Sequence, residues 1–309
     1  MKWFIIALAP PLLYSINNHV DKYLVERFFK NRTSEKGGIG SLVIFTGLIS
    51  ILFCLVIGIS IPSQISISFP HALVIILSGM FLVGSYVPYF SALEYEEASV
   101  ITPLWQFIPI FGYILGFFFL GETLRNIQII GGFLIILGAI SISISFDKKS
   151  AQIKKGILLK MMGAAFLVSL SILLFKIIAL QENFWASVFW EYAGIVIFSL
   201  FLFICIKSYR QQFLSLMRQN TAGFVLVNIL GEVLSFVAKL ASNYVSLLVP
   251  IALLLLVNSL QPLFVFIIGI ILTVFLPKLG KEKLSGRDIL QKFFAIGVMI
   301  AGTLLLIFS

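Results

Sequence analysis

The chain has 309 residues, of which 60% are hydrophobic and only 11% are charged, whereas about a quarter of the residues in an ordinary soluble domain are charged. A soluble fold could not bury that much apolar surface. The 22 Lys and Arg residues outnumber the 13 Asp and Glu residues, but they lie in short gaps between apolar runs. This is the placement that membrane topology selects, and it excludes a nucleic acid as partner.

The apolar runs predict ten transmembrane helices, because a spanning helix needs about 20 mostly apolar residues. The runs are continuous, whereas a membrane barrel would alternate apolar and polar residues. The predicted spans lie near residues 3–21, 39–61, 70–92, 99–120, 126–146, 156–180, 185–206, 221–243, 247–276 and 289–308.

A polar linker at residues 147–155 divides the chain into two halves, residues 1–147 and 156–309, with five predicted spans each. Pro109 is followed by Gly116 in the fourth span, and Pro262 by Gly269 in the ninth. An odd number of spans per half inserts the second half upside down relative to the first. The predicted fold is therefore an all-α polytopic membrane protein made of two inverted five-helix repeats.

The distribution of basic residues predicts the orientation. Outside the spans, most Lys and Arg follow the odd-numbered spans, and only Lys2 and Arg125 lie on the other side. Because Lys and Arg are retained in the cytoplasm, we expect a multi-pass protein of the cell (inner or plasma) membrane with both termini outside.

Several short motifs resemble those of a known family. They are Ala98-Ser99-Val100-Ile101-Thr102-Pro103, Pro109, the pair Gly121-Glu122, and the glycine-spaced run from Gly131 to Gly138. In this order they resemble the EamA-type family of the drug/metabolite transporter superfamily. The resemblance implies ten helices around a central cavity and gradient-driven transport of a metabolite. In such proteins Pro109, Gly121, Glu122 and Pro262 would serve as structural motif residues, with Gly121-Glu122 forming a turn that caps the fourth helix.

Ionisable residues inside the spans are candidates for function, because each costs about 2.5–3.5 kcal/mol at the bilayer centre. Glu232 and Lys239 lie seven residues apart and so share one helix face, which suggests a cavity-facing pair. The alternative is that Lys239 snorkels to the interface. For Lys176 and Glu191, near the ends of their spans, we expect a structural or interfacial role.

Polar residues supply the other candidates for a substrate-binding cavity. Amide and indole groups precede the two span prolines, and if the halves are inverted repeats they meet near the midplane, where such carriers bind substrate. The alternative for these groups is hydrogen bonding between helices. A second polar group ends the first span, where a histidine could titrate near neutral pH; the alternative is a helix end in the headgroup region. The residues near the prolines are Trp105, Gln106, Asn258 and Gln261, and those at the end of the first span are Asn17, Asn18 and His19.

The sequence carries no motif for ATP-driven transport, zinc proteolysis or a Ser-His-Asp triad. Cys54 and Cys205 lie in apolar runs without a nearby ligand. We therefore expect no catalytic residue, no metal and no cofactor, and a protein that is not an enzyme.

The predicted function is secondary active transport of a small polar or amphipathic metabolite by alternating access. Expected partners are this small-molecule substrate, the lipid bilayer and a coupling ion (H+ or Na+). Glycine-rich spans allow close helix approach, either within the chain or with a second copy of it in a homodimer. The alternative is a membrane-embedded enzyme or flippase acting on a lipid-linked substrate, for which only Glu94, Glu96 and Glu97 offer clustered carboxylates.

Overall fold

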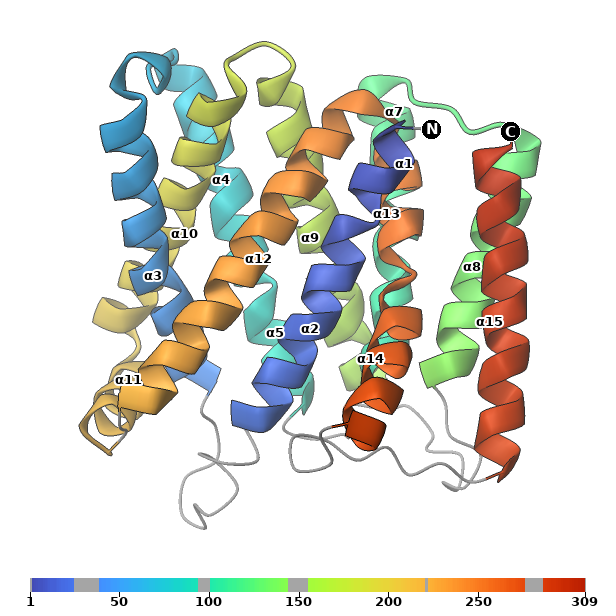
Figure 1. The fold of residues 1–309 in the computed structure, drawn as a ribbon. Helices are drawn as coiled ribbons and strands as arrows, with labels where there is room; N and C mark the ends of the chain where they lie inside the picture. The colour runs from blue at the N-terminus through green and yellow to red at the C-terminus, as the bar shows by residue number, and fades with distance from the viewer. Residues whose placement is uncertain are drawn as a thin grey trace.

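The structure is a computed structural model that describes residues 2–24, 39–93, 101–143, 155–219, 222–275 and 286–308. The acidic group at Glu94, Glu96 and Glu97 lies outside these residues. Within them the chain is entirely helical (Figure 1). The elements are α1 (Lys2–Ala7), α2 (Ala9–Leu24), α3 (Ile39–Ser60), η2 (Pro62–Gln64), α4 (Phe69–Gly84), α5 (Tyr86–Leu93), η3 (Thr102–Gln106), α7 (Phe107–Leu120), α8 (Asn126–Ser143), α9 (Lys155–Ala179), α10 (Phe184–Cys205), α11 (Lys207–Gln219), α12 (Ala222–Leu248), α13 (Ile251–Asn258), α14 (Gln261–Phe275) and α15 (Gly286–Ile307).

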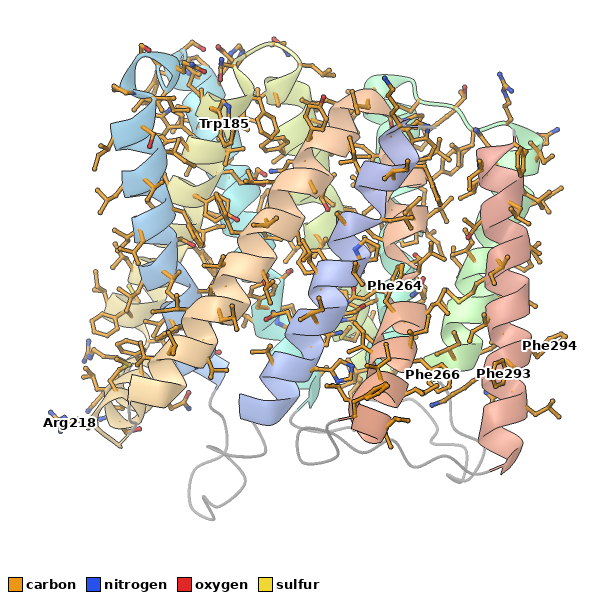
Figure 2. The ribbon with its side chains drawn as sticks, in the orientation of Figure 1. Trp185, Arg218, Phe264, Phe266, Phe293 and Phe294 are labelled. Carbon is orange, nitrogen blue, oxygen red and sulfur yellow. The ribbon has the colours of Figure 1, made fainter. Side chains whose placement is uncertain are left out.

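Seven helical stretches in this part of the chain are long and apolar enough to cross a bilayer, which indicates a multi-pass membrane protein. Two shorter apolar helices, Leu104–Leu120 and Asn126–Ile142, accompany them. Large apolar side chains cover the outside of the bundle. Phe294 on α15, for example, is 74% exposed and points away from the helices (Figure 2). Such an outer surface is stable only where lipid is the solvent.

Prolines interrupt several of the predicted spans. A proline removes a backbone donor and clashes with the carbonyl four residues earlier, so it is tolerated only in the first turn of a helix. Here Pro10, Pro88, Pro109 and Pro262 lie among the first three residues of α2, α5, α7 and α14. The preceding pieces, α1, α4, η3 and α13, are therefore separate helical segments.

The structure corrects two boundaries. Residues 207–220, expected to be a loop, contain α11, whose Tyr209 and Phe213 pack on α3 and α10. The eighth span, expected to end at residue 243, continues as α12 to Leu248. Its end was misplaced because polar residues there suggested a loop, whereas Asn243 and Ser246 are buried and hydrogen-bonded.

Glycines allow close contacts between helices in two parts of the bundle. Gly131 of α8 and Gly302 of α15 face each other so closely that a Cβ on either would lie within 3 Å of the other's carbonyl oxygen. The glycine-spaced face predicted for close approach thus packs within the same chain. On the other side of the bundle, Gly79 of α4 touches the backbone of α10 at Glu191, and Gly194 of α10 touches that of α4 at Ile76.

Both termini lie at one end of the bundle, and α11 lies at the opposite end (Figure 1). The α8–α15 pair forms one side of the molecule, and α3, α10 and α11 form the other. Between these sides, α2 packs against both α12 and α14, while α9 packs against α4 and α7.

We predict that Gly79→Ala destabilises the protein by about 1–3 kcal/mol or more, the usual cost of overpacking. The new Cβ would lie 1.9 Å from the carbonyl oxygen of Glu191, and a helix backbone cannot move aside cheaply. Thermal unfolding of the purified protein in detergent measures the effect. Gly163→Ala on α9 is the matched control, since nothing lies within 4 Å of its Cβ. Equal melting temperatures for the two variants would contradict the prediction.

Candidate functional site

A buried ion pair joins α10 to α12. Lys239 Nζ lies 3.2 Å from Glu191 Oε1, and the two residues are 6% and 0% exposed. Asn243 donates a hydrogen bond from Nδ2 to Glu191 Oε2 at 2.7 Å. The hydroxyl of Ser78 lies 3.0 Å from Glu191 Oε1 and 2.9 Å from the carbonyl oxygen of Ser171, so its single proton is shared between them. Both carboxylate oxygens thus have partners.

Local helix geometry builds this group. Lys239 and Asn243 are four residues apart on α12, so both side chains lie on one face. Glu191 is seven residues from the start of α10, which places it about 10 Å along the helix. The Gly79 contact holds α4 against the backbone of Glu191, and Ser78 is the adjacent residue. The close approach of α4 to α10 therefore brings a hydroxyl to the carboxylate.

Aromatic side chains surround the ion pair. The phenol groups of Tyr14, Tyr86 and Tyr192 are close enough to Glu191 to interact with it or with one another electrostatically. The Tyr192 ring meets Phe236 edge-on at 5.1 Å, and Phe236 stacks on Phe53 at 4.1 Å. Side chains from α2, α3, α5, α10 and α12 thus form one aromatic and polar cluster inside the bundle.

The structure changes the pairing expected for Lys239. The sequence favoured Glu232, two turns away on the same helix, or snorkelling to the interface. Instead Lys239 reaches across to Glu191, which had been assigned a structural or interfacial role. Glu232 accepts a hydrogen bond from Thr46 of α3 at 2.6 Å. Tyr192 interacts electrostatically with both Glu232 and Glu191.

A second buried ion pair lies at the end of the bundle where α7 ends and α13 begins. Lys176 Nζ binds Glu122 Oε1 at 2.5 Å and the carbonyl oxygen of Val249 at 2.8 Å, while the backbone N–H of Ile251 donates to Glu122 Oε2 at 2.7 Å. This pair joins α7, α9 and α13 through backbone groups. Lys176 is therefore buried and paired within the bundle rather than exposed on its surface.

The Gly121-Glu122 turn has a specific geometry. Gly121 has a φ of 65°, a conformation that glycine adopts without strain. Its N–H donates to the carbonyl of Phe117, and the N–H of Glu122 donates to that of Gly116. These bonds form the glycine cap typical of helix C-termini, and they direct the Glu122 side chain back under α7 toward Lys176.

The predicted amide residues occupy two helix interruptions. Gln106 ends η3, and Asn258 ends α13. Both are largely buried, and in the described part of the chain neither Gln106 Oε1 nor Asn258 Oδ1 has a hydrogen-bond partner. A buried acceptor without a partner is costly and marks a candidate site for a polar ligand. Gln261 contributes its backbone carbonyl to Ser15, and Trp105 packs on Tyr89.

The polar residues of the first span hold α2 in place. Asn17 donates to Ser235 Oγ on α12 at 3.1 Å, and His19 Nε2 lies 3.1 Å from the carbonyl of Val265 on α14. Asn18 is exposed. The observed contacts of Asn17 and His19 are helix-to-helix hydrogen bonds.

Sequence reasoning missed Tyr14, Ser78 and Asn243. Only Asn243 left a signal, its spacing of four residues from Lys239; nothing in the sequence relates Ser78 or Tyr14 to a carboxylate on another helix. Among the described residues, no group of three or more His, Cys, Asp or Glu could hold a metal ion, and Cys54 and Cys205 are free thiols.

We predict that Glu191→Gln or Lys239→Met alone destabilises the protein by about 3–5 kcal/mol, because each variant leaves the charge of the other residue buried without a counter-charge. The double variant removes both charges, so most of this loss should be recovered. Thermal unfolding of the wild type, the two single variants and the double variant measures the interaction between Glu191 and Lys239 as a double-mutant cycle. Additive losses would show that the two residues do not interact.

Comparisons with known proteins agree with this description. The model of the EamA-like transporter family matches residues 1–144. The "Uncharacterized protein MJ1333.1" of Methanocaldococcus jannaschii is 33% identical over 128 residues, which are 40% of this chain and 89% of that protein. A solved crystal structure superimposes with a TM-score of 0.67, covering 99% of this chain and 96% of its own at 15% identity. At that identity the likeness concerns the fold alone.

Proposed function

We propose that this chain, which belongs to the EamA-like transporter family, is a secondary active transporter that moves a small polar or amphipathic metabolite across the cell membrane by alternating access. The observation that carries the proposal is the Lys239–Glu191 pair, fully buried among helices long enough to span the bilayer. Ionisable groups at such depth are costly and are usually retained for function.

The helix contacts support an arrangement of ten membrane helices in two inverted repeats. If α2, α3, α4, α7 and α8 correspond to α9, α10, α12, α13–α14 and α15, the contact of α2 with α12 corresponds to that of α9 with α4. The contact of α2 with α14 then corresponds to that of α9 with α7. In the contacting pairs α3–α10, α7–α13 and α8–α15, each helix is the counterpart of the other, so these contacts lie on the symmetry axis. This is the pattern of a two-fold axis between the halves, as in many secondary carriers.

One pair of contacts departs from this symmetry. α4 packs extensively on α10, whereas its counterpart α12 touches α3 only slightly. The Ser78–Glu191 contact belongs to the extensive α4–α10 packing. In our proposal the slight α3–α12 contact, between the helices that carry Thr46 and Glu232, opens and closes during transport. The α4–α10 packing meanwhile keeps Glu191 fixed.

The substrate cavity proposed here lies between the ion pair and the helix interruptions. Lys239 and Glu191 offer both charges, and Gln106 and Asn258 each offer an acceptor without a partner. A solute with a donor and a charged group could compete with the ion pair for these partners. A coupling cation, for which we propose H+ or Na+, could likewise compete with Lys239 for the Glu191 carboxylate. By the distribution of basic residues, the end that carries both termini faces outward.

We predict that Glu191→Gln with Lys239→Met abolishes transport although the double variant retains most of the stability, because it lacks the charges that interact with the solute and the coupling ion. Proteoliposomes loaded with a metabolite panel and given a pH or a Na+ gradient identify the solute and the coupling ion by mass spectrometry of the panel. The double variant is then assayed with the solute found.

The matched control is Glu122→Gln with Lys176→Met, which removes the other buried acid–lysine pair. In our proposal this control keeps saturable transport. Wild-type transport by the Glu191/Lys239 double variant would show that the central pair is only structural and would overturn the proposal.

A further inference from the structure

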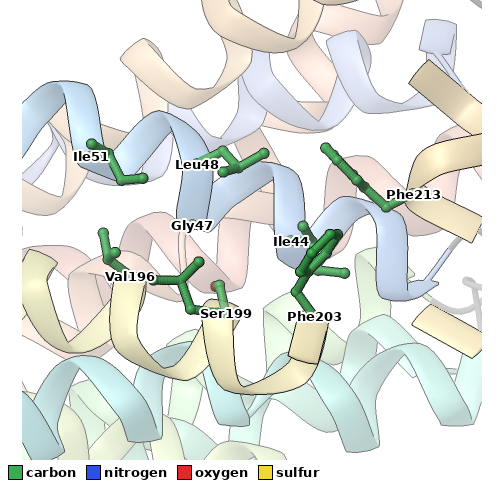
Figure 3. A pocket seen from close by; sticks show the side chains of 9 residues that line it. Ile44, Gly47, Leu48, Ile51, Val196, Ser199, Phe203 and Phe213 are labelled. Carbon is green, nitrogen blue, oxygen red and sulfur yellow. The ribbon is translucent and has the colours of Figure 1, made fainter. Parts of the chain in front are cut away.

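A small apolar groove opens on the outer side of the bundle between α3 and α10 and is closed at one end by α11 (Figure 3). Its volume is about 110 Å³, and its lining is almost entirely apolar. Side chains from eight-residue stretches of α3 and α10 form its walls, so it is about 10 Å long. The lining residues are Ile44, Gly47, Leu48, Ile51, Val196, Ser199, Leu200, Phe203 and Phe213.

The floor of the groove exists because α3 and α10 approach closely. A Cβ on Gly47 would lie 2.1 Å from Cβ of Ser199, and the Ser199 hydroxyl is satisfied by the carbonyl of Val43. No polar group is therefore presented to an occupant. Leu48 and Leu200 are partly exposed at the mouth. The groove faces the acyl region of the membrane, and its shape and chemistry fit a hydrocarbon chain.

The helix that closes the groove is basic and contains no Asp or Glu. Lys207, Arg210 and Arg218 are spaced three and eight residues apart, which places them on one face of α11. The partly exposed Leu214 and Met217 lie on the same face. Phe213, on the neighbouring face, is buried against Ile44 of α3. Figure 2 shows Arg218 at the outer edge of the molecule.

An amphipathic helix with cations beside its apolar face lies in the membrane interface, where it attracts anionic lipid. Here that helix closes an apolar groove that begins at the same depth. We propose that α11 and the α3–α10 groove form a site for one anionic phospholipid, with an acyl chain in the groove and the anionic headgroup attracted by the charges of Lys207, Arg210 and Arg218 along α11. The site lies outside the cavity proposed for transport.

Native mass spectrometry of the full chain in detergent, titrated with phosphatidylglycerol or phosphatidylcholine, tests this site. We expect one retained phosphatidylglycerol that binds about tenfold more tightly than phosphatidylcholine, because the cations recognise the anionic headgroup. Replacing Lys207, Arg210 and Arg218 by Gln should weaken the binding of phosphatidylglycerol about tenfold and leave the binding of phosphatidylcholine unchanged. Replacing Lys2, Arg125 and Lys155 by Gln removes the same charge elsewhere and should change the binding of neither lipid.

The groove is tested separately with Leu48→Trp, which fills its mouth and should weaken the binding of both lipids. The control is Leu137→Trp on α8, since the two leucines are 39% and 42% exposed. Equal binding of the two lipids to the wild type, equal effects of the two charge variants, or unchanged binding in Leu48→Trp would each overturn the proposal. Because these readouts need no transport, they stand or fall independently of the proposed function.

Discussion

The carboxylate of Glu191 has to be satisfied where no water is available, and much of the structure around it follows from this constraint. An ionised group in such surroundings is tolerated only if a counter-charge and hydrogen bonds replace its hydration. Lys239, Asn243 and the shared proton of Ser78 supply these from two other helices. Ser78 can reach the carboxylate only because Gly79 allows α4 to touch α10 backbone to backbone. The α4–α10 contact and the ion pair therefore depend on each other.

The two buried acid–lysine pairs have the same chemistry but different surroundings. Glu122 and Lys176 also bind the backbone at Ile251 and Val249, so neither can leave without exposing the ends of helices. Among the described residues, Glu191 and Lys239 bind each other and side chains only, and the Ser78 hydroxyl is also hydrogen-bonded to the Ser171 carbonyl. Partners on side chains can be exchanged for those of a solute at little cost to the fold, because rotamers change more easily than backbones. On this difference we propose an anchoring role for the first pair and a binding role for the second.

Hydropathy predicts the apolar helices well because a spanning segment must be apolar along its whole length. Local rules also predict the close-packed face from Gly131 to Gly138. The interruptions at Pro10 and Pro262 follow from proline geometry, although the predicted spans ran through both residues. Partner choice lies beyond such rules, because it depends on which helices are neighbours. Glu232 was the natural partner of Lys239 within one helix, and only tertiary packing brings Glu191 closer. The same limit hid α11, whose polar residues resemble a loop until Phe213 is seen buried between α3 and α10.

The two proposed sites share α10. Val196 and Ser199, which line the lipid groove, follow Glu191 by five and eight residues, less than three turns along the helix. Gly194, between them and Glu191, contacts the backbone of α4. A rigid helix held by glycine contacts on both α3 and α4 moves as a unit, since backbone contacts leave no slack for local adjustment. Any movement of α10 therefore displaces the Glu191 carboxylate and the Val196–Ser199 wall of the groove together.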